Sequence, residues 1–357
     1  MEEANDQKRD THGGSPSIAV VIPAYKVAAH VEDVVRTVPA FVRHIYVVDD
    51  ACPEQSGAVV EAMADPRVSV VFNGRNRGVG GAVLAGYATA VGDGHDIIVK
   101  IDGDGQMDPL KMWDIVEPII EGEADYTKGN RFYDLTYIGN MPRMRIAGNA
   151  VLSFLAKAST GYWDILDPTN GYTAIHADAL RRLNARKISE RYFFETDILF
   201  RLNLARAVVV DVPLDARYGD EVSNLKISRV IGEFAFKHAR NAMKRVFYNY
   251  FLRDFTIASV ELVAGLILVA VGTVFGAVSW AHSFASGAAT SAGTVMLAAL
   301  PIMLGLQLLL AFLAYDIARV PRRRISRRSR NPEWRSSDHR LPRSFDASHS
   351  TRERLER

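Results

Sequence analysis

Cysteine is almost absent from this chain of 357 residues, which contains only Cys52. A single thiol excludes an internal disulfide framework and a zinc site built from several cysteines, and it is compatible with the reducing cytosol. The N-terminus also lacks a long apolar run after a basic start, because residues 1–17 are polar and charged. We therefore expect no secretory signal there, and a disordered lead over residues 1–16.

Charged residues are rare in two stretches near the C-terminal end of the chain. Residues 257–280 contain one charged side chain, Glu261, and residues 294–315 contain none. Each stretch is about long enough to cross a bilayer core of roughly 30 Å, and each is apolar on every face. A buried hairpin in a soluble core is the alternative, but we predict a transmembrane hairpin over residues 255–316. Lys and Arg flank this pair and are absent between its members, so the positive-inside rule predicts an inner (plasma) membrane protein with both termini cytoplasmic.

The net charge of +2 conceals a local excess of arginine, since residues 319–330 contain seven. This region belongs to a basic cytosolic tail over residues 317–357. Ahead of the hairpin, residues 227–254 combine apolar side chains at helical spacing with Lys and Arg. They predict a juxtamembrane amphipathic helix on an anionic membrane surface, although packing against the soluble domain is an equal alternative for its first half. Nucleic-acid binding by the tail is the weaker interpretation of its arginines, and we predict no nucleic-acid partner.

Residues 17–226 alternate short apolar strands with helical stretches, which predicts an α/β domain with a mostly parallel sheet. Candidate strands cover residues 18–22, 44–48, 68–72, 96–101 and 208–212. Candidate helices cover residues 31–37, 54–64, 80–91, 110–120, 145–159 and 196–205. Ligands of such sheets bind outside the carboxyl ends of the strands, and four of these strands end in polar or glycine-rich segments. We therefore expect one functional edge.

The fourth strand leads directly into two carboxylates, Asp102 and Asp104, separated by Gly103. The two side chains project the same way in an extended chain, and carboxylates together with substrate phosphates are the ligands that Mg²⁺ or Mn²⁺ prefers. A solvated Asp/Gly turn is the alternative. The pattern predicts a metal and a nucleotide bound together.

Two further segments join this edge. Asp49 and Asp50 follow the second strand, and their carboxylates can accept hydrogen bonds from a base or a ribose. The run Arg77-Gly78-Val79-Gly80-Gly81-Ala82 opens a helix with small residues, which suits close approach either of a ligand or of a neighbouring element.

Five motifs follow one another along this part of the chain: Pro23-Ala24-Tyr25, Asp49-Asp50, Arg77 to Ala82, Asp102-Gly103-Asp104-Gly105-Gln106 and Gly129-Asn130-Arg131-Phe132. Taken together, these motifs resemble the family 2 glycosyltransferases of the GT-A nucleotide-diphospho-sugar transferase fold. The resemblance covers residues 17–316, and with the paired apolar spans it points to the polyprenyl-phosphate branch, which includes dolichol-phosphate mannosyltransferases and bacterial undecaprenyl-phosphate glucosyltransferases.

The resemblance implies transfer of a sugar, with inversion, from a nucleotide diphosphate sugar to polyprenyl (undecaprenyl) phosphate, and we prefer a uridine donor. It puts Asp49 near the base and Mg²⁺ or Mn²⁺ on Asp102 and Asp104, with Gln106 beside them. A lipid phosphate is already an anionic nucleophile, so the enzyme needs cations more than a general base. Arginine grips phosphate with paired hydrogen bonds, and the resemblance assigns this role to Arg131, Arg145 and Arg217.

Family 2 enzymes carry acceptor-side acids where this chain has Asp167, Glu195 and Asp197. We expect Asp167 to line the sugar or acceptor site, and Glu195 or Asp197 to contact a sugar hydroxyl, with helix capping an equal alternative for Asp197. Ser223 and Lys226 stand where the family has an adjacent Ser-Lys pair, which two residues interrupt here.

Two other functions are weighed against this one. A processive polysaccharide synthase also joins this fold to membrane helices, but the Gln-x-x-Arg-Trp motif is missing and two spans are few for an export channel. The second is a membrane-tethered scaffold with a relict nucleotide site. A homo-oligomer is conceivable because Gly265, Gly272 and Gly276 allow close helix contact. A flippase and a downstream transferase are expected from the family.

Overall fold

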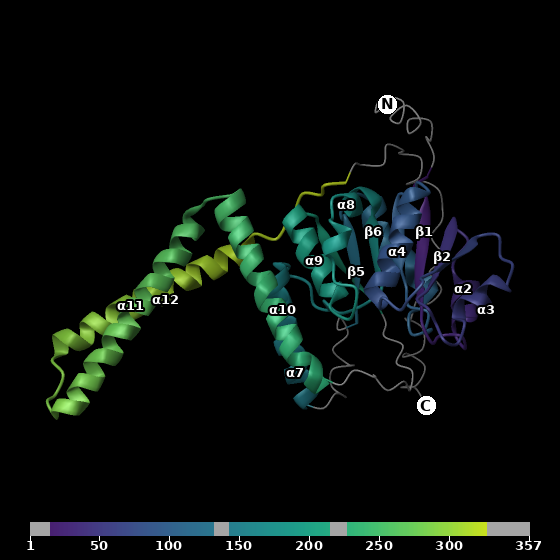
Figure 1. Cartoon of the computed structure of the whole chain (residues 1–357). Coiled ribbons are helices and arrows are strands. Elements are labelled where there is room, and N and C mark those ends of the chain that lie inside the picture. Colours follow the sequence, from purple (N-terminus) through teal and green to yellow (C-terminus); the bar gives the residue numbers. More distant parts are fainter. Residues whose placement is uncertain (1–14, 132–142, 215–226, 327–357) are drawn as a thin grey trace, which may run out of the picture. The chain divides into compact units, whose positions relative to one another are not determined.

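The computed structural model describes residues 15–131, 143–214 and 227–326. Its centre is a sheet of seven strands in the order β3-β2-β1-β4-β6-β5-β7 (Figure 1). The strands are β1 Ile18–Ala24, β2 His44–Asp49, β3 Val68–Phe72, β4 Ile97–Lys100, β5 Tyr126–Asn130, β6 Thr173–His176 and β7 Val209–Pro213. Only β6 runs antiparallel to its neighbours, β4 and β5. The fold class is therefore the predicted mostly parallel α/β arrangement of GT-A type.

Successive side chains of the central strands point to opposite faces of the sheet, and this creates two apolar cores. Ala19 and Val21 of β1 lie in one core with α4 (Val79–Gly92) and α9 (Phe194–Ala205), whereas Ile18, Val20 and Ile22 lie in the other with α2 (Val31–Thr37) and α5 (Met112–Ile120). Both faces of the sheet are covered, which explains why these strands are apolar throughout. The remaining elements of the domain are α3 (Ser56–Glu61), η1 (Pro109–Lys111), α7 (Arg143–Thr160), α8 (Ala177–Arg181) and η2 (Ala185–Lys187).

The predicted amphipathic segment forms α10 (Ile227–Phe247) and a π-helical turn, η3 (Tyr248–Arg253). One side of α10 packs against the domain, where the ring of Phe234 meets that of Phe193 edge to face, with the ring centroids 5.4 Å apart. Another side exposes apolar residues, and Phe236 and Met243 are each 66% exposed. One face of α10 therefore packs against the domain, and the exposed apolar residues of the other face are suited to contact a membrane surface.

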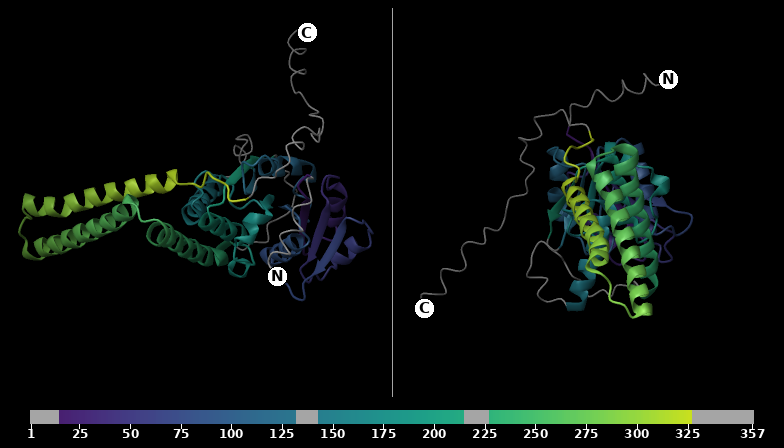
Figure 2. Two further views of the ribbon diagram at one scale, coloured as in Figure 1. Left: turned by 90° about the horizontal axis from the view of Figure 1, so that it is seen from above. Right: turned by 90° about the vertical axis from the view of Figure 1, so that its left-hand side faces the viewer.

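Two long apolar helices follow, α11 (Ile257–Ser286) and α12 (Ala292–Ala318), and both are long enough to cross a membrane. They run side by side in both views of Figure 2. A Cβ at Gly265 would lie 3.0 Å from the carbonyl oxygen of Gly305, and one at Gly272 would lie 2.8 Å from that of Ala298. These glycines thus allow close packing of the two helices within one chain. The sequence alone could not distinguish this packing from packing between two chains.

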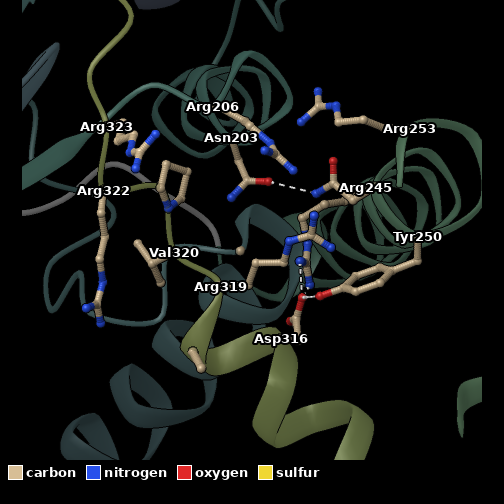
Figure 3. Close-up of a pocket in the computed structure, with 14 residues that line it drawn as sticks. Asn203, Arg206, Arg245, Tyr250, Arg253, Asp316, Arg319, Val320, Arg322 and Arg323 are labelled. Atoms are coloured by element: carbon tan, nitrogen blue, oxygen red, sulfur yellow. Dashed lines mark hydrogen bonds and ion pairs between the residues drawn. The ribbon is translucent and has the colours of Figure 1, made fainter. Parts of the chain in front are cut away.

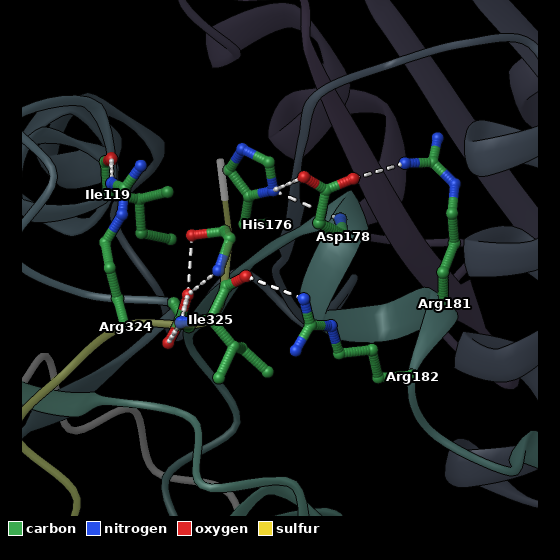
Figure 4. A network of polar contacts seen from close by, with 9 residues as sticks. Ile119, His176, Asp178, Arg181, Arg182, Arg324 and Ile325 are labelled. Carbon is green, nitrogen blue, oxygen red and sulfur yellow. Dashed lines mark hydrogen bonds and ion pairs between the residues drawn. The ribbon is translucent and has the colours of Figure 1, made fainter. Parts of the chain in front are cut away.

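After α12 the chain returns to the α/β domain (Figure 4). The backbone N–H groups of Ile325 and Ser326 donate to the buried carboxylate of Asp125, just before β5. Arg324 donates to the carbonyl oxygen of Ile119, and Arg182 donates to that of Ile325. The α11–α12 hairpin is therefore connected to the domain by the chain segments both before α11 and after α12.

Candidate active site

The expected functional edge exists, because β1, β2 and β4 are neighbouring parallel strands whose carboxyl ends lie together. Ala24 at the end of β1 pairs in register with Asp49 at the end of β2. Lys100 ends β4, directly before the Asp102 turn. Pro23 and Ala24 are strand residues, and Tyr25 is 44% exposed at the edge.

Asp49 is buried and forms part of the framework beneath this edge. Its two carboxylate oxygens accept from the backbone N–H groups of Cys52, at 2.7 Å, and Gly57, at 2.8 Å. A Cβ at Gly57 would lie 2.9 Å from Asp49 Oδ2, so glycine allows this close approach. A base would have to use the remaining lone pairs of Asp49.

Asp50 orders the glycine-rich loop. Its carboxylate accepts from the backbone N–H groups of Arg77, at 3.0 Å, and Gly78, at 2.7 Å. A Cβ at Gly80 would lie 2.6 Å from the carbonyl oxygen of Ser189, and Arg77 is paired with Glu190 at 2.5 Å. Of the two alternatives for these small residues, the described contacts support close packing of a neighbouring segment.

Lys100 is buried at the centre of the site. Its Nζ lies 2.7 Å from Asp102 Oδ1 and 3.7 Å from Glu195 Oε1. Burial disfavours the charged ammonium, but the carboxylates of Asp102 and Glu195 outweigh this effect, so the pKa of Lys100 lies above its ordinary value. A Cβ at Gly171 would lie 2.3 Å from Lys100 Nζ and 2.7 Å from Asp102 Oδ2, so any larger residue would displace this pair.

Asp102 and Asp104 are the two carboxylates that the sequence predicts as metal ligands. Asp104 Oδ1 accepts from the backbone N–H of Gln106 at 3.0 Å, which fixes the turn after β4. Within the described ranges, no cluster of three or more His, Cys, Asp or Glu could hold an ion. A pair of hard oxygen donors suits Mg²⁺ or Mn²⁺ whose other ligands are substrate phosphates and water.

Arg131 and Asp167 form a two-pronged ion pair beside this edge. Arg131 Nε lies 2.8 Å from Asp167 Oδ2, and a terminal guanidinium nitrogen lies 3.3 Å from Oδ1. Asp167 is fully buried and also accepts from the hydroxyl of Thr169, whereas the side chain of Arg131 remains 38% exposed. Asp167 therefore orients Arg131 and leaves part of the guanidinium accessible to an anion.

Asp197 has a different environment from Glu195. It is fully buried and accepts from the backbone N–H of Ser189 at 2.8 Å, from Arg201 at 3.1 Å, and from Asn241 of α10 at 3.0 Å. These contacts join α9 to its neighbours and use both oxygens. Of the two acids proposed for a sugar hydroxyl, Glu195 is the one that lies with Lys100 and Asp102.

Comparison with known proteins agrees with this geometry. The profile described as "Glycosyl transferase family 2" matches residues 19–183. An undecaprenyl-phosphate mannosyltransferase of Micrococcus luteus is 32% identical over 173 residues, which cover 48% of this chain and 70% of that protein. The chain is a family 2 glycosyltransferase.

Other relatives of this glycosyltransferase are more distant. A UDP-N-acetylglucosamine–dolichyl-phosphate N-acetylglucosaminyltransferase of Methanococcus voltae is 26% identical over 216 residues, covering 56% of this chain and 86% of that one. Among solved structures, a glucosyl-3-phosphoglycerate synthase from Mycobacterium tuberculosis, in complex with Mn²⁺, UDP-glucose and phosphoglyceric acid, aligns with a TM-score of 0.47 at 20% identity, over 64% of this chain and 79% of that chain.

Four predicted site residues of the glycosyltransferase take part in none of the contacts given above. Arg145 lies in the first turn of α7. Arg217, Ser223 and Lys226 lie outside the described residues. Their roles stay predictions.

Sequence reasoning missed two buried lysines and one glycine of this glycosyltransferase. Lys128 on β5 is buried, donates to the carbonyl oxygen of Asn170, and has its pKa lowered to about 8 by burial. Lys100 and Gly171 complete the group described above. A lysine that ends an apolar strand is a signal that could have found Lys100, since a buried lysine is rare unless it is paired.

Asp211 on β7 lies in the same electrostatic environment. Its Oδ2 accepts from the backbone N–H of Leu166 at 2.7 Å, while Oδ1 is buried and has no hydrogen-bond partner among the described residues. Burial raises the pKa of Asp211 to about 6. This carboxyl therefore holds a proton more tightly in the folded protein than in the unfolded chain.

Proposed function

We propose that this glycosyltransferase transfers a sugar, with inversion, from a nucleotide diphosphate sugar, preferably a uridine one, to polyprenyl phosphate of the undecaprenyl type. The observation that carries the proposal is the group at one sheet edge: Asp102 and Asp104 for the donor diphosphate, with Arg131 held beside them, in a chain that also has two apolar helices. Both relatives named above act on lipid phosphates, which supports the same acceptor class here.

Asp102 and Asp104 would hold Mg²⁺ or Mn²⁺, which neutralises charge on the departing diphosphate when it is bound. The ammonium of Lys100 keeps Asp102 in position, and the buried carboxylate of Asp167 keeps Arg131 in position. Arg131 then offers its exposed N–H groups to a phosphate oxygen. Glu195, 15% exposed in its side chain, is suited to accept a hydrogen bond from a sugar hydroxyl.

The attacking atom in this proposal is an oxygen of the lipid phosphate. It forms a bond to the anomeric carbon as the bond to the nucleotide diphosphate breaks, and the electron pair leaves with the diphosphate. A phosphate monoester needs no deprotonation by a side chain above a pH of about 6. The chain's residues therefore act by positioning and by charge.

We further propose that α11 and α12 anchor the enzyme in the inner membrane with the catalytic domain and both termini in the cytoplasm. Arg253 before α11 and the arginines after α12 support this orientation. A lipid-linked sugar made on this side would need a flippase and a transferase on the opposite side.

The test is transfer from radiolabelled uridine and guanosine diphosphate sugars to undecaprenyl phosphate, using the full chain in neutral detergent with Mg²⁺ or Mn²⁺. Asp104→Asn removes one candidate ligand, and Asp33→Asn, an exposed residue of α2, is the control with the same change of charge. We expect metal-dependent glycolipid from one donor, lost in Asp104→Asn and retained in Asp33→Asn. Nucleotide binding without any glycolipid would favour the scaffold, and a ladder of lengthening products would favour a processive synthase.

A further inference from the structure

Arginines converge on a cavity of about 320 Å³ that is separate from the catalytic edge (Figure 3). It lies between the end of α9, the π-helical turn η3 and the segment that follows α12. Glu195 lies in the first turn of α9, and Asn203, in the last turn of the same helix, lines the cavity; eight residues at 1.5 Å each separate the two by about 12 Å along the helix axis. The six arginines that line it are Arg206, Arg245, Arg253, Arg319, Arg322 and Arg323.

Part of this positive charge is neutralised within the protein. Arg245 is buried and forms a two-pronged pair with Asp316, at 2.6 and 2.8 Å, and Tyr250 also donates to Asp316. Arg206 and Arg319 share a single carboxylate, that of Asp254. Only two carboxylates form ion pairs with these six guanidinium groups among the described residues, so positive charge is in excess around the cavity.

Several of these guanidinium groups can still donate hydrogen bonds to a ligand. Arg253 and Arg323 have no carboxylate within 4.0 Å among the residues that the structure describes. Nη1 of Arg319 is buried, and no acceptor within the described part of the chain reaches it. Arg322 is exposed and lies near Asp164; burial raises the pKa of the Asp164 carboxyl, and the positive charges of Lys157 and Arg322 offset part of that rise. A buried N–H without an acceptor is costly, and an oxyanion in the cavity would satisfy it.

The position of the cavity identifies a source for that oxyanion. Its lining includes Arg253, four residues before α11 begins, and Asp316 to Arg323, where α12 ends. When a helical hairpin spans a bilayer, the ends of its helices lie at the level of the lipid phosphates, and arginines there bind anionic headgroups.

We propose that this cavity is a binding site for a phosphate headgroup, supplied by an anionic phospholipid of the bilayer. The site is distinct from the donor and acceptor sites at the catalytic edge. It holds the end of the hairpin and η3 against the end of α9 when the lipid is bound. The proposal does not depend on which sugar the enzyme transfers, or on whether transfer occurs.

The experiment measures lipid binding with the full chain in neutral detergent. Phosphatidylglycerol, phosphatidylcholine or inorganic phosphate is titrated while thermal unfolding is followed, and bound lipid is counted by native mass spectrometry. The test variant is Arg322→Gln/Arg323→Gln, because both side chains are exposed and neither forms a described ion pair. The control with the same loss of charge is Arg43→Gln/Arg186→Gln, two exposed arginines elsewhere on the domain.

We expect phosphatidylglycerol, and not phosphatidylcholine, to raise the unfolding temperature of the wild type and the control. Apparent affinity should fall about tenfold or more in the test variant, because hydrogen bonds between charged groups are lost. An equal response of test and control variants would overturn the proposal, since general surface charge would then explain it. Protection by inorganic phosphate that phosphatidylglycerol does not match would overturn the lipid source. If the double variant fails to fold, Arg253→Gln alone should show the same loss.

Discussion

Replacing Gly171 with alanine should reduce transfer far more than it reduces stability. The added Cβ would lie 2.3 Å from Lys100 Nζ and 2.7 Å from Asp102 Oδ2, whereas ordinary contact needs about 3.5 Å. Both clashes are with the ends of side chains, so the ammonium and the carboxylate can move by about 1 Å while the backbone stays in place. Overpacking of this kind costs about 1–3 kcal/mol of stability. A shift of about 1 Å in a positioned group can lower the rate about 100-fold, equivalent to roughly 3 kcal/mol in the barrier.

The assay compares initial rates of glycolipid formation with thermal unfolding of the same preparation. Gly92→Ala is the matched control, since a Cβ at Gly92 would meet nothing within 4 Å. We expect Gly171→Ala to remain folded, to need more Mg²⁺ or Mn²⁺ for half-maximal rate, and to be about 100-fold slower, while Gly92→Ala stays near the wild type. A rate for Gly171→Ala within twofold of the wild type would refute the idea that the Lys100–Asp102 pair positions the metal.

Three further predictions concern stability. The pKa of Asp211 is about 6 in the folded protein and 3.8 ordinarily, so between these pH values the folded state binds more protons than the unfolded chain. The free energy of unfolding therefore falls as pH rises through this range, by at most about 3 kcal/mol. Asp211→Asn should unfold at a higher temperature than the wild type at pH 7.5, and at an equal temperature near pH 4. Asp197→Ala should lose about 3–5 kcal/mol in denaturant unfolding, because it removes the ion-pair partner of Arg201 and the acceptor of both the Ser189 backbone N–H and the buried Asn241 amide. At low temperature the folded Asp197→Ala variant should keep its activity, whereas Glu195→Gln should keep its stability and lose activity. Gly305→Val should lower the thermal midpoint without changing the KM for the nucleotide sugar, because the new side chain would meet the backbone of the facing helix at 2.8 Å.

Sequence patterns were sufficient for the parts of the fold that depend on local rules. Strands β1 to β4 and β7 were predicted because apolar runs ended at turn residues, and their shared polar edge followed from parallel pairing. Strands β5 and β6 were missed. The first contains Thr127, Lys128 and Asn130, and the second has only four residues, so neither has the apolar run by which buried strands are recognised. Antiparallel insertion of β6 between β4 and β5 is a long-range pairing that no local pattern contains.

The site divides in the same way. Asp102, Asp104 and Arg131 could be identified from motifs, because each follows the end of a strand. The partners that hold them could not, because Lys100 meets Glu195, and Arg131 meets Asp167, only after distant segments have packed. Asp197 illustrates the limit, since an acid in the first turn of a helix gives no sign that Arg201 and the buried Asn241 will donate to it.

The return of the chain to Asp125 after α12 affects how the enzyme can move. A domain joined to a helical hairpin by a single polypeptide segment can rotate about that segment. Here there are two connections, one through α10 and η3 and one through the hydrogen bonds of Ile325 and Ser326 to Asp125. Turning about either is opposed by the other, so the two connections together restrict how the domain that carries Asp102 and Asp104 can rotate relative to α11 and α12.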